Sequence, residues 1–169
     1  SLDSVQDYVD GMYLTITYKN KTPALNHALV KLLQKYSAHI SYFKWINDFS
    51  AARQYALDQI PKGKTIFIYW QDVDDILQNG DKLSLIVSDM VKFNHSSVFL
   101  KYLYAVELNE QGDIKEILIE HKRERILRND GVWKWIGALH ETLIEQQIEN
   151  VNKDIFVDTP GRMIEPDEG

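Results

Sequence analysis

The first half of the chain alternates between short segments with strand-like patterns and segments whose apolar residues recur every three or four positions. The first pattern is typical of strands and the second of amphipathic helices. Strands are predicted over residues 12–18, 39–45 and 65–70, and helices over residues 22–36, 47–60 and 81–93. A strand followed by a helix, three times in succession, predicts an α/β fold with a largely parallel sheet.

The second half changes to longer alternating segments. Residues 96–129 indicate two long strands joined by the turn sequence NEQGD, which is a hairpin signal. A turn and a short aromatic stretch follow at 130–137, and we favour a strand over a helix for 138–149. We therefore expect one α/β domain over residues 1–150, in which antiparallel strands follow the mostly parallel sheet. The tail at 151–169 ends in Pro, Gly and acids, which favours disorder.

Composition places the chain among globular proteins, since 44% of its 169 residues are hydrophobic and 26% are charged. No apolar run approaches the roughly 20 residues that span a bilayer, and the acidic start SLDSVQDYVD lacks the apolar core of a secretion signal. The sequence has no cysteine, which excludes thiolate chemistry and fits a reducing compartment. We expect a cytoplasmic protein, and the net charge of −6 argues against broad nucleic-acid binding.

Three acids, Asp72, Asp74 and Asp75, follow the apolar run TIFIYW. In an extended segment residues two apart point the same way, so Asp72 and Asp74 would present two carboxylates on one side. Mg²⁺ and Mn²⁺ prefer oxygen ligands, and phosphate oxygens of a substrate can complete such a site. The alternative is a solvated helix N-terminus with Asp75 near the helix dipole. A position at the end of an apolar strand favours the metal interpretation.

A basic cluster occupies HKRERILRN and contains Arg123, Arg125 and Arg128. The guanidinium fork suits phosphate oxygens. In a strand, Arg123 and Arg125 share one face with His121. Taken alone, the cluster fits a solvated strand face or internal Arg–Glu pairs better than a binding site.

Aromatic and titratable residues lie together in WKWIGALHE. Trp133 and Trp135 can form a stacking platform for a sugar or a base. His140 is a candidate metal ligand and Glu141 a candidate general base. For the two tryptophans and for His140, each taken singly, packing in a core is the stronger alternative.

Arg53 lies on an alanine-rich turn of the predicted helix in NDFSAARQYAL. Small neighbours allow close packing, and a guanidinium that emerges among them can reach a diphosphate. An internal pair between Arg53 and an acid is the equal alternative.

In chain order, these segments resemble four motifs of family 2 glycosyltransferases with the GT-A fold. The segments are WINDFSAARQYAL, WQDVDDIL, KRERILRN and WKWIGALHETL. The resemblance covers roughly residues 1–148. It implies a GT-A-like three-layer α/β sandwich and an enzyme that transfers a sugar from a nucleotide-sugar to an acceptor hydroxyl, with inversion at the anomeric centre.

The resemblance also implies roles for individual residues. Asp72 and Asp74 match the DxD motif, which holds Mn²⁺ or Mg²⁺ against the donor diphosphate, and His140 would be a further metal or phosphate contact. Inversion requires a base for the acceptor hydroxyl, for which Glu141 is the expected residue. The other expected contacts are Arg53, Asp72, Arg125 and Arg128 at the donor diphosphate and Trp133 and Trp135 in stacking on the sugar or acceptor.

The sequence departs from the family pattern at three points. The family begins with a strand that lines the nucleotide pocket, whereas this sequence begins within the helix that follows. We therefore expect an N-terminally incomplete domain, an exposed edge on the strand at 12–18, and little or no transferase activity from these 169 residues. The next strand ends as ITYKNKTPAL, without the usual acidic turn, and Gln54 stands where the family has asparagine.

Two other interpretations stay open. A degenerate, non-catalytic GT-A module would bind a sugar or a nucleotide or take part in assembly. The segment DVDDIL also resembles the start of haloacid-dehalogenase phosphatases, although Ile76 stands where that motif has threonine. For a transferase we expect a UDP- or GDP-linked sugar donor, a glycan, lipid or protein acceptor, no nucleic-acid partner, and self-association as one way to cover the edge strand.

Overall fold

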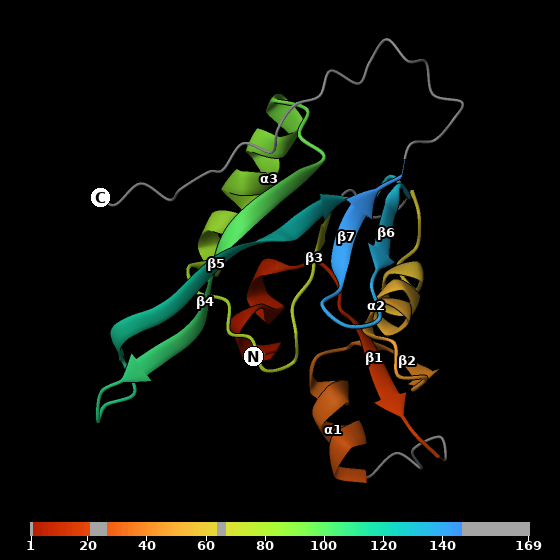
Figure 1. Cartoon of the computed structure of the whole chain (residues 1–169), viewed down its shortest axis with the longest axis horizontal. Helices are drawn as coiled ribbons and strands as arrows, with labels where there is room; N and C mark the ends of the chain where they lie inside the picture. The colour runs from red at the N-terminus through yellow and green to blue at the C-terminus, as the bar shows by residue number, and fades with distance from the viewer. Residues whose placement is uncertain (1, 21–26, 64–66, 147–169) are drawn as a thin grey trace. The chain divides into compact units, whose positions relative to one another are not determined.

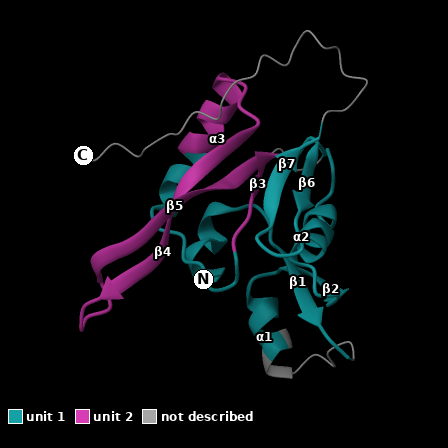
Figure 2. Cartoon of the chain, viewed as in Figure 1, with its two compact units in different colours: residues 1–66, 72–84, 129–151 teal, residues 67–71, 85–128, 152–169 magenta. Residues whose placement is uncertain are grey.

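The computed structural model describes residues 2–20, 27–63 and 67–146 of this mixed α/β protein (Figure 1). The chain divides into two compact units that interleave along the sequence (Figure 2). Of the described residues, 2–20, 27–63, 72–84 and 129–146 form unit 1, and 67–71 and 85–128 form unit 2. The sequence suggested one domain over 1–150, and its predicted tail lies outside the described residues.

Unit 1 combines short helices with two small sheets. Its elements are the 3-10 helices η1 (Leu2–Ser4), η2 (Gln6–Tyr8) and η3 (Gly80–Lys82), the strands β1 (Tyr13–Tyr18), β2 (His39–Lys44), β6 (Trp133–Ile136) and β7 (Thr142–Glu145), and the helices α1 (His27–Lys35) and α2 (Phe49–Asp58). β1 pairs with β2 in parallel, and β6 pairs with β7 antiparallel. Helix α2 contacts β1, β2 and β6, and therefore joins the two sheets. The strand predicted between 138 and 149 is confirmed by β7.

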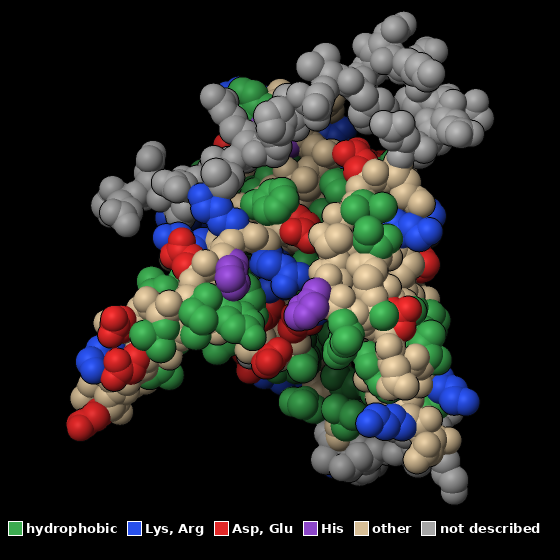
Figure 3. Space-filling model, in the orientation of Figure 1, with side chains coloured by type: hydrophobic (Ala, Val, Ile, Leu, Met, Phe, Trp, Pro, Cys, Tyr) green, Lys and Arg blue, Asp and Glu red, His purple; other side chains and the backbone are tan. Residues whose placement is uncertain are grey.

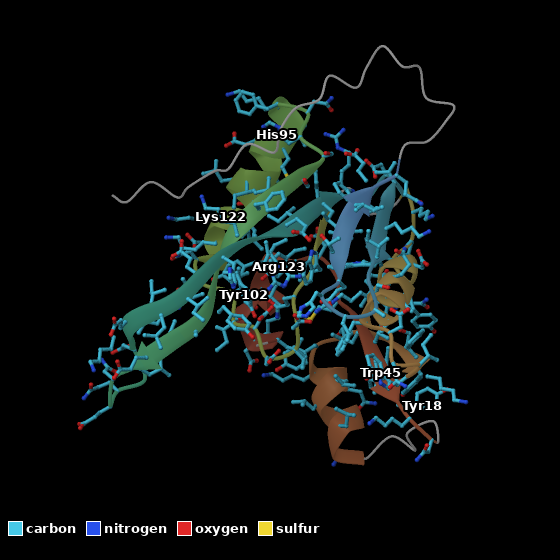
Figure 4. All side chains as sticks on the ribbon, viewed as in Figure 1. Tyr18, Trp45, His95, Tyr102, Lys122 and Arg123 are labelled. Atoms are coloured by element: carbon cyan, nitrogen blue, oxygen red, sulfur yellow. The ribbon has the colours of Figure 1, made fainter. Side chains whose placement is uncertain are left out.

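Helix α2 begins directly after the parallel pair. The backbone N–H of Trp45 donates to the carbonyl of Tyr18 at 2.7 Å, which continues the ladder beyond the strand ends (Figure 4). Asn47 adopts a left-handed φ of 60° and turns the chain, a conformation that asparagine tolerates better than most residues. Asp48 then caps the helix, because its side chain accepts the N–H of Ala51 at 2.9 Å. The predicted start of this helix is confirmed.

Unit 2 contains one antiparallel sheet and most of a helix. Its elements are β3 (Phe67–Tyr69), α3 (Leu83–Lys92, whose first two residues belong to unit 1), β4 (Ser97–Leu108) and β5 (Ile114–Arg128). β4 and β5 form the predicted long hairpin. In its turn the side chain of Asn109 accepts the backbone N–H groups of Gln111 and Asp113, and Gly112 takes a φ of 88° that favours glycine.

The apolar core of unit 2 lies at the end of the hairpin that is opposite its turn. Its buried side chains are Ile68, Met90, Val98, Ile126 and Leu127. Residues 114–122 of β5 are all exposed, and Figure 3 shows apolar side chains along this arm with acids at its tip. A two-stranded ribbon has no second layer to cover either face, which explains the change from buried to exposed along one strand.

The predicted mostly parallel sheet is not formed by the described residues, in which β1–β2 is the one parallel pairing and the others are antiparallel. The apolar run at 65–70 is typical of a buried central strand, but this position is not what the described residues show. β3 is an edge strand in the order β3-β5-β4. Its Ile68 lies opposite Leu127, so β3 forms its backbone pairing with the buried end of β5, in the antiparallel direction. No helix in the described ranges is long and apolar enough to cross a bilayer.

Candidate functional site

A guanidinium in unit 1 joins two acids from distant parts of the sequence. Arg53 Nη1 lies 2.8 Å from Asp72 Oδ1, and its Nη2 donates to Asp72 Oδ2 at 3.1 Å. Its Nε donates to Glu141 Oε1 at 2.9 Å. The guanidinium therefore contacts Asp72 through its two terminal nitrogens and Glu141 through Nε. We call the two acids Asp72 and Glu141, together with the Arg53 guanidinium that joins them, the bridged acid pair.

Arg53 is held in place by its helix and by a neighbouring ring. It lies in the second turn of α2, directly after Ala51 and Ala52. Its guanidinium carbon lies 5.2 Å from the centre of the Trp135 ring, which is within the range of a cation–π contact. Trp135 is buried, with 5% of its surface exposed. Its ring therefore packs against the guanidinium and supports its position.

Glu141 comes from the loop between β6 and β7, and this loop is fastened to the start of α2. The backbone N–H of Phe49 donates to the carbonyl of Ala138 at 3.1 Å. Gly137 has a φ of 91° and His140 a φ of 55°. Two left-handed residues in so short a loop make the tight reversal that delivers Glu141 to Arg53.

Asp72 comes from a turn, and this corrects the expectation of an extended segment. The N–H of Asp75 donates to the carbonyl of Asp72 at 3.1 Å, and the N–H of Asp72 donates to the side chain of Asp75 at 3.0 Å. Residues 73 and 74 are therefore the corner of a turn, and the alternation that would place Asp72 and Asp74 on one side does not apply. Asp74 is exposed to solvent.

The two carboxylates of the bridged acid pair raise the pKa of Arg53. Burial by itself would lower the pKa of Arg53, but the hydrogen bond and charge of Asp72, followed by those of Glu141, outweigh it and raise that pKa. The exposed fractions of the side chains are 20% for Arg53, 37% for Asp72 and 12% for Glu141. Asp72 is thus the member of the pair that solvent reaches most easily.

The expected metal ligands are not assembled into a complete set. Asp72 and Asp74 supply the oxygen ligands that Mg²⁺ and Mn²⁺ prefer, so the donor chemistry fits. His140 and Asp74 are both exposed. Across the described ranges, no group of three or more His, Cys, Asp or Glu side chains is gathered closely enough to hold a metal. A metal on Asp72 and Asp74 would need water or phosphate oxygens to complete its shell.

The two tryptophans of the aromatic segment have different surroundings. Trp135 is buried, and its backbone N–H donates to Gln54 Oε1 at 2.9 Å. Trp133 is half-buried and pairs with Glu145 across the β6–β7 ladder. The core alternative therefore describes Trp135 better than a stacking platform does.

The arginines of KRERILRN lie in unit 2. Arg125 is buried, with 4% of its surface exposed, and is flanked by the rings of Trp70 at 4.2 Å and Tyr102 at 4.7 Å. Its Nη1 donates to the carbonyl of Trp70 at 3.3 Å. The guanidinium carbon of Arg123 also lies 5.4 Å from the centre of the Trp70 ring; Figure 4 labels Arg123 and Tyr102. As predicted, Arg123 and Arg125 share a face, but Arg125 packs within it.

Arg128 lies at the end of the same hairpin that is opposite its turn, and its guanidinium has hydrogen-bond partners there. It donates to the side chain of Asn94 at 2.9 Å and to the carbonyl of His95 at 3.2 Å. Its guanidinium also lies 6.0 Å from the ring centre of Phe67. These contacts tie β5 to the segment after α3 within unit 2.

No protein-family model and no curated protein matches this sequence.

Sequence reasoning missed one residue that organises this site. Gln54 holds the backbone of Trp135, and its Nε2 donates to Asp58 at 3.1 Å within α2. In the sequence, Gln54 stands out only as a departure from an expected asparagine. Its position next to Arg53, on a helix expected to pack near the motif, was the signal that could have identified it.

Proposed function

We propose that the protein is a glycosyltransferase that moves a sugar from a nucleotide-sugar donor to an acceptor hydroxyl, with inversion and with Mn²⁺ or Mg²⁺ as cofactor. The observation that carries the proposal is the contact of one guanidinium, Arg53, with both Asp72 and Glu141. These residues come from three separate motifs of the family resemblance. A purely structural ion pair needs only one acid and one base. It would not require residues from three separate motifs to meet at one guanidinium.

The chemistry of the cluster fits this reaction. Transfer from a nucleotide-sugar develops negative charge on the departing diphosphate, and a cationic group beside it stabilises that charge. A metal would supply such a charge, and Asp72 and Asp74 together with phosphate oxygens would be the groups to hold it. Arg53 is a second cation suited to phosphate. Glu141 supplies the carboxylate that removes the acceptor proton, and Arg53 orients it.

The test is donor cleavage by the 169-residue chain, with UDP- and GDP-linked sugars and with Mn²⁺ or a chelator present. We expect slow release of UDP or GDP that depends on the metal. Glu141→Gln keeps an oxygen for Arg53 but removes the base. In a form of the protein that shows transfer to an acceptor, this variant should lower the transfer by about 10²–10⁴-fold while donor affinity stays nearly unchanged. Unchanged turnover in this variant would contradict the assigned base.

A non-catalytic binding module is the second candidate, and one observation favours it. Both acids assigned to chemistry are engaged by Arg53, and the described residues contain no assembled metal group. Such a module would bind a nucleotide or a sugar without turnover. Calorimetry and product analysis with UDP, GDP and their sugars separate the two functions, because binding without any product after prolonged incubation supports the module and metal-dependent release of UDP or GDP supports the transferase.

A further inference from the structure

We propose that the outer edge of β1 is an interface between two copies of this chain, which pair their β1 strands antiparallel across a two-fold axis centred on Thr15. The outer edge is the side of β1 that faces away from β2. The inference does not depend on the proposed transferase function, because it rests on the backbone of one small sheet in unit 1.

The sheet of β1 and β2 is smaller than a stable parallel sheet. The two strands pair in parallel, and in the described part of the chain no other strand joins them. Parallel strands occur almost only within larger sheets, and two strands alone are marginally stable in water. A further strand is therefore expected along one edge of this pair.

The hydrogen bonds to β2 determine which backbone groups of β1 face the outer edge. The carbonyls of Met12 and Tyr18 accept the N–H groups of His39 and Trp45, at 2.8 Å and 2.7 Å. Successive residues of a strand direct their backbone N–H and C=O groups to opposite sides. Since the register contains no shift, the even-numbered residues bond to β2. The residues whose backbone groups face the outer edge are Tyr13, Thr15 and Thr17.

The side chains of β1 do not protect this edge against pairing. Natural edge strands are protected by charges, proline, bulges or short length. β1 has the sequence YLTITY, without charge or proline over six residues. Among the described strands the other uncharged one is β3, which has only three residues. The long strand β4 carries Lys101 and Glu107 and several bulges. β1 is therefore the edge best suited to accept another strand.

A second copy of β1 fits this edge. In an antiparallel pair centred on Thr15, that residue meets its own copy, and Tyr13 meets Thr17, so all the outward backbone groups find partners. Leu14 then lies opposite Ile16 on one face. Apolar residues face β-branched ones and threonine faces threonine, which are stabilising cross-strand pairs, and no like charges meet.

The pairing extends contacts that unit 1 already has. Thr15 Oγ1 lies 2.8 Å from Ser41 Oγ on the neighbouring strand. The two-fold axis would join two such contacts into one row of hydroxyls across four strands. The assembly closes as a dimer, because the same edge is used by both copies. Its new outer strand is β2, which ends in exposed Lys44, and an edge lysine opposes further pairing.

Sedimentation equilibrium of the 169-residue chain tests for the dimer. Six residues on each side are fewer than the roughly 20–30 of a stable interface, so we expect a reversible dimer whose share rises with concentration. Amide hydrogen exchange should slow in the dimer at Tyr13, Thr15 and Thr17. A chain that stays monomeric up to about 1 mM would overturn the proposal and leave the edge to a strand of another protein.

Single cysteines test the register, since the native sequence has none. Thr15→Cys brings two thiols to the axis, with Cα atoms about 5.5 Å apart, which is within the range of a disulfide. Thr17→Cys is the matched control, because its two copies would lie four residues apart along the strands, about 14 Å. Mild oxidation should link Thr15→Cys into a dimer and leave Thr17→Cys largely unlinked. Equal linking of the two variants, or none in Thr15→Cys, would refute the register.

A backbone substitution tests the hydrogen bonds themselves. Thr15→Pro removes one outward N–H from each copy and no bond to β2, a position at which an edge strand tolerates proline. The loss of two bonds should weaken dimerisation by about 5- to 150-fold. Thr15→Val keeps the N–H and should dimerise like the wild type.

If circular dichroism shows that Thr15→Pro is unfolded, Thr17→Lys replaces it. Thr17 is the exposed residue of β1, and a lysine on the edge should weaken the pairing without disturbing the fold. Unchanged dimer affinity in a folded Thr15→Pro or Thr17→Lys variant would place the contact elsewhere and overturn the proposal.

Discussion

Trp135 donates its backbone N–H to the side-chain oxygen of Gln54 at 2.9 Å, a contact between residues 81 positions apart in the sequence. The contact joins β6 to helix α2 immediately beside Arg53. The loop that carries Glu141 follows β6, so the distance between Glu141 and the helix depends on this bond.

Gln54→Ala should loosen that junction. It leaves the N–H of Trp135 without its acceptor, and we expect a loss of about 1 kcal/mol in the free energy of unfolding, measured by urea denaturation. Gln59→Ala is the matched control, because the Gln59 side chain donates to the carbonyl of Tyr55, four residues earlier in the chain, and not to another segment among the described residues. Equal effects of the two substitutions would contradict the role given to Gln54.

Trp135 and Trp133 should differ sharply when they are truncated. Trp135→Ala removes a buried ring from unit 1 and should lower the free energy of unfolding by about 3–5 kcal/mol. Trp133 is half-buried, so its truncation should cost clearly less. A sugar-stacking role for Trp133 would appear instead as weaker ligand binding in a folded Trp133→Ala variant. A stable Trp135→Ala protein would show that the ring is not part of the core.

Arg125 should behave as a structural residue of unit 2. Arg125→Met keeps the length of the side chain but removes the charge between two rings and the bond to the Trp70 carbonyl. We expect a loss of about 1–3 kcal/mol in unfolding free energy. The comparison is Arg123→Met, which should affect stability little. UDP affinity that falls in a fully stable Arg125→Met protein would support the donor-binding role predicted from the sequence.

The helix cap of α2 predicts a specific pH dependence. The backbone N–H of Ala51 and then the hydroxyl of Ser50 hold the pKa of Asp48 below its usual value of 3.8. A lowered acid pKa stabilises the folded protein above the unfolded pKa, and this contribution is lost as the pH falls through the folded pKa. Asn also caps helices but carries no charge.

Asp48→Asn should therefore be less stable than the wild type at about pH 6, and the difference should shrink towards about pH 2.5. Urea midpoints across that interval measure it. Asp3 has a pKa lowered by hydrogen bonds from Lys35 and Tyr36, so it titrates in both proteins and cancels in the comparison. A difference that stays constant with pH would show that the charge of Asp48 contributes nothing.

Local patterns in the sequence were sufficient to predict most elements. The alternation in 97–108 and 114–128 and the Gly at the turn determine a hairpin through contacts between near neighbours in the chain. The capped start of α2 was predictable for the same reason, because Asp48 bonds to a residue three positions away. The four motifs are also sufficient to predict Arg53, Asp72 and Glu141 as site residues, although not their contact with one another.

Tertiary structure alone decided what those residues touch. The apolar pattern of β3 is equally compatible with a central and an edge strand, and the choice of β5 as its antiparallel neighbour depends on residues nearly sixty positions away. The spacing of Asp72 and Asp74 implies a shared side only if the backbone is extended, and the bond from Asp72 to Asp75 closes a turn instead. Whether Arg53 meets a phosphate, one acid or two depends on how α2, the turn at Asp72 and the β6–β7 loop pack together, which no local pattern encodes because the ion pairs form only after the chain has folded.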